Sequence, residues 1–269
     1  MKKNLLIASL LLSGASFAQF TQANEPTIGS TQLMHVCDSF VTNYAGTTGT
    51  GVTWDYSNIQ GVLGEVKTIE VMLPSATPEG SNFTGAAKAL DIPNFITSYF
   101  SSTLTQRKSQ GFTFVTDPPI GTVNVVLDTD DELLMNYPYA VTNSLVDAVS
   151  GTASSSAGNF PATGSAQTTV DGSGTLILNS TTTYNNVLRF KIVDNISANT
   201  GPFFGIITLA REQYEYYDLA NSSMPLFIHA QLVITIGGTP QPLNLVLSSA
   251  QPDTYLSVAN NELAGVAVY

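Results

Sequence analysis

The sequence predicts an all-β protein built as an antiparallel β-sandwich, and three observations lead to this fold class. Short apolar segments alternate with polar residues at a period of two along most of the chain. Clusters of Gly, Pro, Asn and Ser separate these segments at the short intervals typical of all-β folds. Very little of the chain shows the 3.6-residue period of an amphipathic helix. The pattern leaves open jelly-roll-like or Greek-key wiring, and one sandwich or two packed β subdomains divided near residue 132.

The first 18 residues have the pattern of a secretory signal peptide. Lys2 and Lys3 precede an apolar run from Leu5 to Leu12, and small residues at 16 and 18 mark a cleavage site before Gln19. The apolar run is too short to span a bilayer, and no second run of 18 apolar residues follows. We therefore expect residues 19–269 to form the β-sandwich region, not to span a membrane, and to be secreted or at the cell surface, or periplasmic if export goes no further.

The charge and the cysteine count exclude some classes of protein. Nine basic residues stand against 20 acidic ones, for a formal net charge of −11. A chain of this charge repels phosphate backbones, which excludes a nucleic-acid partner. The single Cys closes no intramolecular disulfide, so stability must come from burial.

The expected elements follow from the alternation, and the hairpin over residues 168–193 is the clearest. Its first strand alternates Leu176 and Leu178 with Thr175 and Ile177, and its second places Leu188, Phe190 and Ile192 on one inward face. Ala86–Leu90 is compatible with a helical turn, and residues 96–104 are ambiguous. The small-residue stretch 151–164 is interpreted as strand and turn rather than linker. Further strands are expected at 33–41, 52–57, 64–73, 112–115, 123–128, 136–148, 203–209, 213–219, 226–236, 243–247 and 263–269.

Two groups of residues suggest metal ligands. His35 and Cys37 share a strand face, but His229 is the only other His, so a buried thiol beside an ordinary His is the favoured interpretation. His229 lies on the half-polar face of its strand, which favours a structural or exposed His over a catalytic one. Residues Asp128–Glu132 (DTDDE) form the densest charge cluster, with alternate carboxylates of the kind that bind Ca²⁺. They lack the Gly and the spaced Glu of a calcium loop, so a solvated acidic turn is favoured, and no metal or cofactor is assigned.

Aromatic residues offer a binding surface. Trp54, the only Trp, is interpreted as a core anchor whose indole N–H needs a partner, with a sugar-stacking platform as the alternative. A set of tyrosines suits either a patch that binds glycans or proteins, or cross-strand packing, which we favour. These tyrosines are Tyr137, Tyr139, Tyr214, Tyr216 and Tyr217.

No catalytic constellation is recognisable. The chain lacks G-x-S-x-G and H-E-x-x-H, so we expect no enzyme activity. A glycoside hydrolase needs only two carboxylates, which Glu70, Glu215 or Asp218 would supply in a sandwich cleft, but no spacing selects a pair.

Several segments carry a resemblance to a known group. They are Ala18-Gln19, Trp54–Ser57, Tyr137–Tyr139, Val170–Leu176, Tyr184–Arg189 and Tyr214–Pro225. In this order they resemble uncharacterised secreted β-rich proteins of the Bacteroidota, of the type usually associated with type IX secretion. The resemblance implies a surface or secreted β-rich protein and no catalytic residues. A C-terminal sorting domain, typical of that group, is not recognisable before Tyr269.

The function expected from the sequence is binding, adhesion or surface assembly without catalysis. The partner is expected to be another protein or a second copy of this chain, with a glycan as a further option. For assembly, Leu263–Tyr269 is the candidate edge strand, although closing the protein's own sheet is the favoured role for it. The alternative function is a carbohydrate-active enzyme or carbohydrate-binding module that uses carboxylates and Tyr in a sandwich cleft.

Overall fold

The computed structural model describes residues 19–39, 46–116, 121–156, 158–201 and 205–256, and most of them lie in strands. Three single-turn 3₁₀ helices lie at Gln22–Asn24, Pro74–Ala76 and Gly80–Asn82. The strands are β1 (Gln19–Phe20), β2 (Thr31–Cys37), β3 (Gly49–Asp55), β4 (Gln60–Met72), β5 (Lys88–Ile92), β6 (Ile96–Ser102), β7 (Gln106–Val115), β8 (Thr122–Asp130), β9 (Glu132–Asn136), β10 (Tyr139–Ala140), β11 (Ser144–Ser155), β12 (Gly158–Ile177), β13 (Thr183–Asn199), β14 (Ile206–Asp218), β15 (Phe227–Ile236), β16 (Thr239–Ser248) and β17 (Thr254–Tyr255). The all-β prediction is confirmed.

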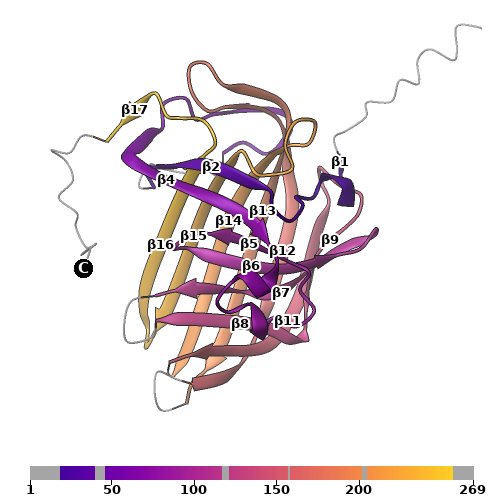
Figure 1. Ribbon diagram of the computed structural model, residues 1–269, viewed down its shortest axis with the longest axis vertical. Coiled ribbons are helices and arrows are strands. Elements are labelled where there is room, and N and C mark those ends of the chain that lie inside the picture. The colour runs from indigo at the N-terminus through magenta and orange to yellow at the C-terminus, as the bar shows by residue number, and fades with distance from the viewer. Residues whose placement is uncertain (1–18, 40–45, 117–120, 157, 202–204, 257–269) are drawn as a thin grey trace, which may run out of the picture.

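Two layers face each other, as in a sandwich. Strands β12 to β16 run side by side as one layer, and β2, β4 to β8 and β11 cross in front of them (Figure 1). The layers are parts of one fifteen-stranded sheet of the described residues, which continues from one layer to the other through β11–β12 and β16–β2. Within each layer most neighbours in space are neighbours in the chain, a simpler wiring than a jelly roll or a Greek key. Strands on both sides of residue 132 belong to this sheet.

The main core fills the space between the layers. The front layer supplies large side chains such as Phe100 and Phe112, and the back layer supplies Ile228 and Leu232 together with small residues such as Ala230. Large side chains packed against small ones fill such an interior without voids. The alternation over 226–236 therefore predicted the inward face of β15 correctly.

The central hairpin is confirmed as β12 and β13, but both of its strands contribute to two different cores. Leu188 and Phe190 point between the layers, whereas Leu176 and Val187 lie in a second cluster with Trp54. Bulges in β12 between Val170 and Gly172 and between Gly174 and Leu176 shift the register. The alternation of inward-facing and outward-facing side chains is therefore interrupted along this strand. The expectation of one buried face for the hairpin is corrected to two. The outer core is covered by β3, which pairs in parallel with the end of β12.

For three further segments, the structure can be compared with the conformation expected from the sequence. Ala86–Leu90, compatible with a helical turn, instead enters β5, because pairing with β4 and β6 outweighs the helix propensity of its alanines. Residues 96–104 resolve mainly into β6. The stretch 151–164 forms the turn-connected ends of β11 and β12, as expected.

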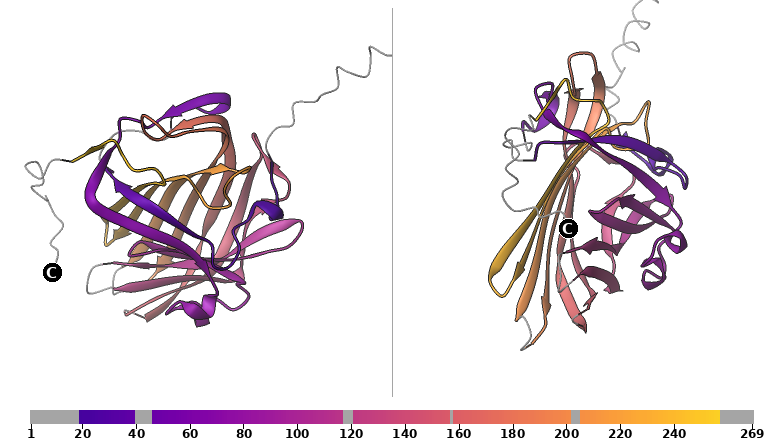
Figure 2. Two further views of the ribbon diagram at one scale, coloured as in Figure 1. Left: turned by 45° about the horizontal axis from the view of Figure 1, so that its top comes forward. Right: turned by 60° about the vertical axis from the view of Figure 1, so that its left-hand side comes forward.

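The layers are joined unequally along their two sides. β11 and β12 pair along their whole common length, whereas β16 meets β2 through only three residue pairs, at Val246, Leu247 and Ser248. The first half of β16 pairs with β15 alone. The views in Figure 2 show β14 to β16 diverging from the front layer toward one end. The layers are therefore least constrained at that end.

The free edge of β16 carries Pro240 and Pro242, both exposed. A proline in a paired strand must direct its missing N–H away from the ladder, so both positions lack a donor on the outer edge. Such an edge resists pairing with another chain. We predict that Pro240→Thr/Pro242→Thr increases self-association, measured by sedimentation velocity, whereas Gln241→Thr, on the opposite parity of the strand, leaves it unchanged. A double variant that stays as dispersed as the parent would contradict this role of the prolines.

Candidate ligand-binding site

A stripe of polar side chains runs into the interior from β14. Arg211, Gln213 and Glu215 occupy alternate positions of this strand and are 7%, 4% and 8% exposed. Alternation directs all three to the same face as Leu209 and Tyr217, which is the face that packs against the front layer. Because burying charged and polar groups costs free energy unless they are paired, this stripe marks the functional candidate in the fold.

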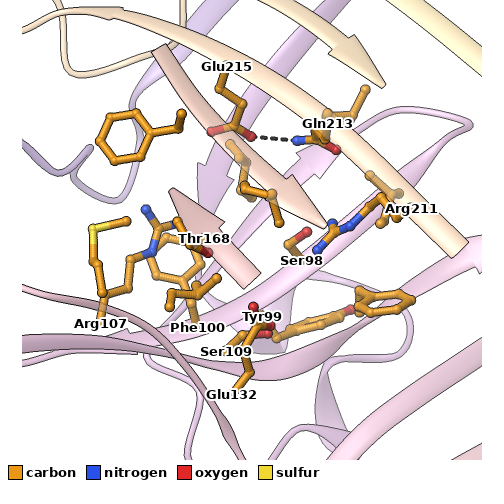
Figure 3. A pocket seen from close by; sticks show the side chains of 18 of the residues that line it. Ser98, Tyr99, Phe100, Arg107, Ser109, Glu132, Thr168, Arg211, Gln213 and Glu215 are labelled. Atoms are coloured by element: carbon orange, nitrogen blue, oxygen red, sulfur yellow. Dashed lines mark hydrogen bonds between the residues drawn. The ribbon is translucent and has the colours of Figure 1, made fainter. Parts of the chain in front are cut away.

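These side chains surround a cavity of about 50 Å³ between the layers (Figure 3). Glu132 and Ser109 reach it from the front layer, and Gln213 and Glu215 reach it from the opposite side. The cavity is larger than the roughly 10–15 Å³ that one water needs. Its lining residues are Phe20, Leu90, Ile92, Ile96, Ser98, Tyr99, Phe100, Arg107, Ser109, Phe112, Glu132, Leu134, Met135, Thr168, Phe190, Ile192, Arg211, Gln213, Glu215 and Tyr217.

Some polar atoms of the stripe form ion pairs or hydrogen bonds within the protein. Arg211 forms an ion pair with Asp194 and lies over the ring of Phe112, with 5.2 Å between the guanidinium carbon and the ring centre. Glu215 accepts hydrogen bonds from Gln213 Nε2 at 2.6 Å and from the Tyr217 hydroxyl at 2.7 Å. These contacts fix the orientation of the Gln213 amide, since its nitrogen faces a carboxylate.

Several buried polar atoms around the cavity, from the stripe and from other strands of the described residues, have no hydrogen-bond partner. Within the described ranges, buried atoms without a hydrogen bond include Glu132 Oε1, Gln213 Oε1 and Thr168 Oγ1, together with the Nε atoms of Arg107 and Arg211. All five residues line the cavity. A buried polar group left unpaired costs about 1–3 kcal/mol, so this concentration indicates that the cavity accommodates a molecule with polar atoms.

The pKa of Glu132 is strongly perturbed by the interior. Burial raises its pKa to about 8, and the nearby carboxylate of Asp194 adds to this effect against the opposing charge of Arg211. The side chain therefore changes its charge in the neutral pH range. An acid in a cavity whose pKa is shifted by burial and by specific charged neighbours is a candidate functional group.

The N-terminal segment closes one end of the cavity. Phe20 lines it, and Glu25 is 5% exposed while accepting hydrogen bonds from Ser102 at 2.6 Å and from the Tyr137 hydroxyl. Although burial alone would raise the pKa of Glu25, Arg107, Ser102, Tyr137 and Lys88 together hold it below its usual value. The segment is thus anchored by a carboxylate that stays charged.

A second, apolar pocket of about 60 Å³ lies between the layers next to the polar cavity. Its walls continue the same strand faces two residues further on: Phe114 follows Phe112 on β7, and Leu209 precedes Arg211 on β14. Positions i and i+2 of a strand lie about 7 Å apart on one face, so the two spaces adjoin. The lining residues are Phe114, Thr116, Val123, Val125, Ala153, Ser154, Ser155, Phe160, Ile196, Ala198, Thr200, Ile207, Leu209, Ile234 and Ile236.

The aromatic candidates are packing residues. Trp54 is 2% exposed and donates its indole N–H to the Thr47 carbonyl at 2.9 Å, which confirms the core-anchor interpretation. Four of the five tyrosines are buried and Tyr137 is half-buried, which confirms cross-strand packing rather than a surface patch. The buried tyrosines are Tyr139, Tyr214, Tyr216 and Tyr217.

The candidate metal ligands do not gather. Cys37 is buried, its Sγ donates to the His35 carbonyl, and burial raises its pKa to about 12. His229 is buried and stacks on Tyr214, and burial lowers its pKa to about 4. Among the residues that the structure describes, no three His, Cys, Asp or Glu side chains come together as a metal site.

The acidic cluster Asp128–Glu132 divides between solvent and interior. Asp128 and Asp130 are exposed, and Asp131 pairs with Lys108 at 2.9 Å. Glu132 points the other way into the cavity. Asp128–Asp130 are thus solvated as expected, but they form the end of β8 rather than a turn, and the interpretation is wrong for Glu132.

The carboxylates considered for glycoside hydrolysis lie apart in the fold. Glu70 pairs across strands with Thr31 and Asp91, Glu215 faces the cavity, and Asp218 accepts hydrogen bonds from the turn at residues 220–221. Of the three, only Glu215 lines the cavity.

Arg211, Gln213 and Thr168 were not predicted from the sequence as site residues. The available signal was an Arg and a Gln on the same strand face as the apolar Leu209. The Leu263–Tyr269 edge candidate and the signal segment lie outside the described residues.

No helix in the described ranges is long and apolar enough to cross a membrane.

Comparisons with known proteins name no relative. No family model, curated protein or solved structure matches the chain, so the Bacteroidota resemblance stays a prediction.

Proposed function

We propose that this protein acts by binding, as a non-catalytic protein of the cell envelope or the exterior that holds a small amphipathic molecule between its two layers. The apolar part of the ligand occupies the pocket near Leu209, and its polar end reaches the cavity near Glu132. The observation that carries the proposal is the set of unpaired buried polar atoms around one cavity that adjoins an apolar pocket.

The architecture supports this mode of binding. The polar groups sit on regular strands of both layers, which hold them in place better than loops would. The layers diverge where β16 leaves β2, so the alkyl chain of a ligand can enter between them with little disruption of the sheet. The location at the envelope or outside rests on the signal-peptide pattern of residues 1–18.

The other functions draw less support. Binding of a glycan at the surface would use exposed aromatic rings, and of the rings proposed for it all but the half-buried Tyr137 are buried. Assembly through the free part of β16 is opposed by Pro240 and Pro242.

Filling the apolar pocket tests the proposal. Ala198 lines it and is 7% exposed, so Ala198→Leu places three additional carbon atoms in a space of about 60 Å³. We expect this variant to bind 1-octanol at least tenfold more weakly than the parent, measured by ¹⁵N NMR titration of the mature chain.

The matched control is Ala210→Leu, which makes the same change on the exposed face of the adjacent strand β14. It should bind as the parent does. Equal affinity of all three proteins, or amide shifts confined to other surfaces, would remove the pocket as the site. Unfolding midpoints measured alongside separate a loss of binding from a loss of fold.

A further inference from the structure

We propose that the polar end of the ligand is a primary ammonium group, so that the protein selects alkyl amines over alcohols and carboxylates of the same chain length. The inference rests on the proposed function and names the ligand class for the same site. It follows from which atoms in the cavity lack partners, from the charges around them and from the size of the space.

The unpaired acceptors match the donors of an ammonium. A primary ammonium has three N–H donors and no acceptor. The cavity presents three unpaired oxygens, Glu132 Oε1, Gln213 Oε1 and Thr168 Oγ1, on residues that are 2%, 4% and 2% exposed. They come from β9, β14 and β12, so they approach from different sides of the space (Figure 3).

The guanidinium groups that carry the unpaired Nε donors already lie beside carboxylates. Arg211 pairs with Asp194 through its terminal nitrogen, and Arg107 lies 3.9 Å from Glu25. An anionic ligand would have to compete with these carboxylates for the guanidinium groups. In addition, it would meet the carboxyl groups of Glu132 and Glu215 in a poorly hydrated space, where like charges repel strongly.

The size of the cavity limits the head group. A volume of about 50 Å³ suits an aminomethyl group or a few waters. A sugar or a phosphate ester exceeds this space. The ligand is therefore an amine whose chain extends past Phe112 toward Phe114 and the apolar pocket.

The protonation of Glu132 adds a pH signature. Its raised pKa leaves it protonated at pH 6, where it donates a proton instead of accepting one. The groups that act on it are Asp194, Asp147, Arg211 and Ser109. Because binding of the ammonium requires the carboxylate, the affinity for the amine should rise between pH 6 and pH 8.5, and the affinity for the alcohol should not.

The experiment compares 1-octylamine, 1-octanol and octanoate on the mature chain by NMR titration at pH 8. We expect the amine to bind at least tenfold more tightly than the alcohol, and octanoate to bind most weakly. Glu132→Gln should lower the affinity for the amine to that for the alcohol, because it removes the charge that attracts the ammonium. The matched control, Glu212→Gln, changes an acid on the outer face of β14 and should behave as the parent does.

The outcomes separate this inference from the proposed function. Equal binding of the three ligands, or tightest binding of octanoate, would overturn the amine assignment while the apolar pocket stands. Retention of the amine preference in Glu132→Gln would also overturn it. Binding of none of the three would remove the proposed function itself.

Discussion

Asp171→Ala is expected to lower the free energy of unfolding by about 3–5 kcal/mol, because it leaves the charge of Arg189 buried without its partner. Arg189 is 0% exposed, and its Nε and Nη2 donate to the two carboxylate oxygens of Asp171 at 2.7 and 2.9 Å. Its guanidinium carbon lies 5.1 Å from the ring centres of Trp54 and Tyr214. The Asp171 side chain is only 12% exposed, so the guanidinium loses its carboxylate at a place with little access to solvent.

Two further variants serve as controls for this measurement. Arg189→Met/Asp171→Ala removes both charges from the same place and should recover much of the loss, because apolar replacement of a buried pair is often nearly neutral. Lys191→Ala breaks an ion pair on the same strand, 3.3 Å from Glu212, whose side chains are about one-third or more exposed. Lys191→Ala should lower the free energy of unfolding by less than about 1 kcal/mol.

Urea unfolding followed by far-ultraviolet circular dichroism measures these effects, with the fluorescence of the single Trp54 as a local probe. A loss below 1 kcal/mol for Asp171→Ala would show that the guanidinium stays hydrated. A double variant as unstable as the single one would show that the guanidinium, rather than its charge balance, holds the outer core together.

Alternation alone predicted the inward face of β15 over residues 226–236 well. It did not predict what covers the opposite face. Arg189 alternates with Leu188 and Phe190 and looks exposed in the sequence, yet β3, more than 100 residues earlier in the chain, brings Trp54 over it. Local pattern carries no information about such distant pairing, which depends on the whole sheet.

The cavity was hidden from the sequence for the same reason. Glu132 belongs to a run of charges whose first members are exposed, so composition favours solvent for all of them. Its side chain turns inward because β9 pairs with β7, which brings it toward Arg211 on the opposite layer. The inward placement of Arg211 on β14 was readable from alternation, but its meeting with Glu132 requires the closed two-layer arrangement.

The stability of the protein should fall by about 1.5–2 kcal/mol as the pH rises from 6.5 to 8, and Glu132→Gln should abolish most of this slope. Burial raises the pKa of Glu132 to about 8 in the folded protein, well above the value of a free Glu. Between these two values the folded state holds a proton that the unfolded state releases. Stability contributed by this group is therefore full at low pH and is lost as the pH rises through the folded pKa.

His229 acts in the opposite direction and in a different range. Burial lowers its pKa to about 4 from an ordinary value near 6.5, so the unfolded chain binds a proton that the folded one does not. Its contribution to stability falls as the pH drops from 6.5 to 4 and is constant above that range. The window from pH 6.5 to 8 thus isolates Glu132, and the difference between the parent and Glu132→Gln removes the contributions of the groups common to both proteins. Parallel stability profiles of the two proteins in this window would show that Glu132 is ionised in the fold at neutral pH, with water or a bound cation supplying what the surrounding side chains do not.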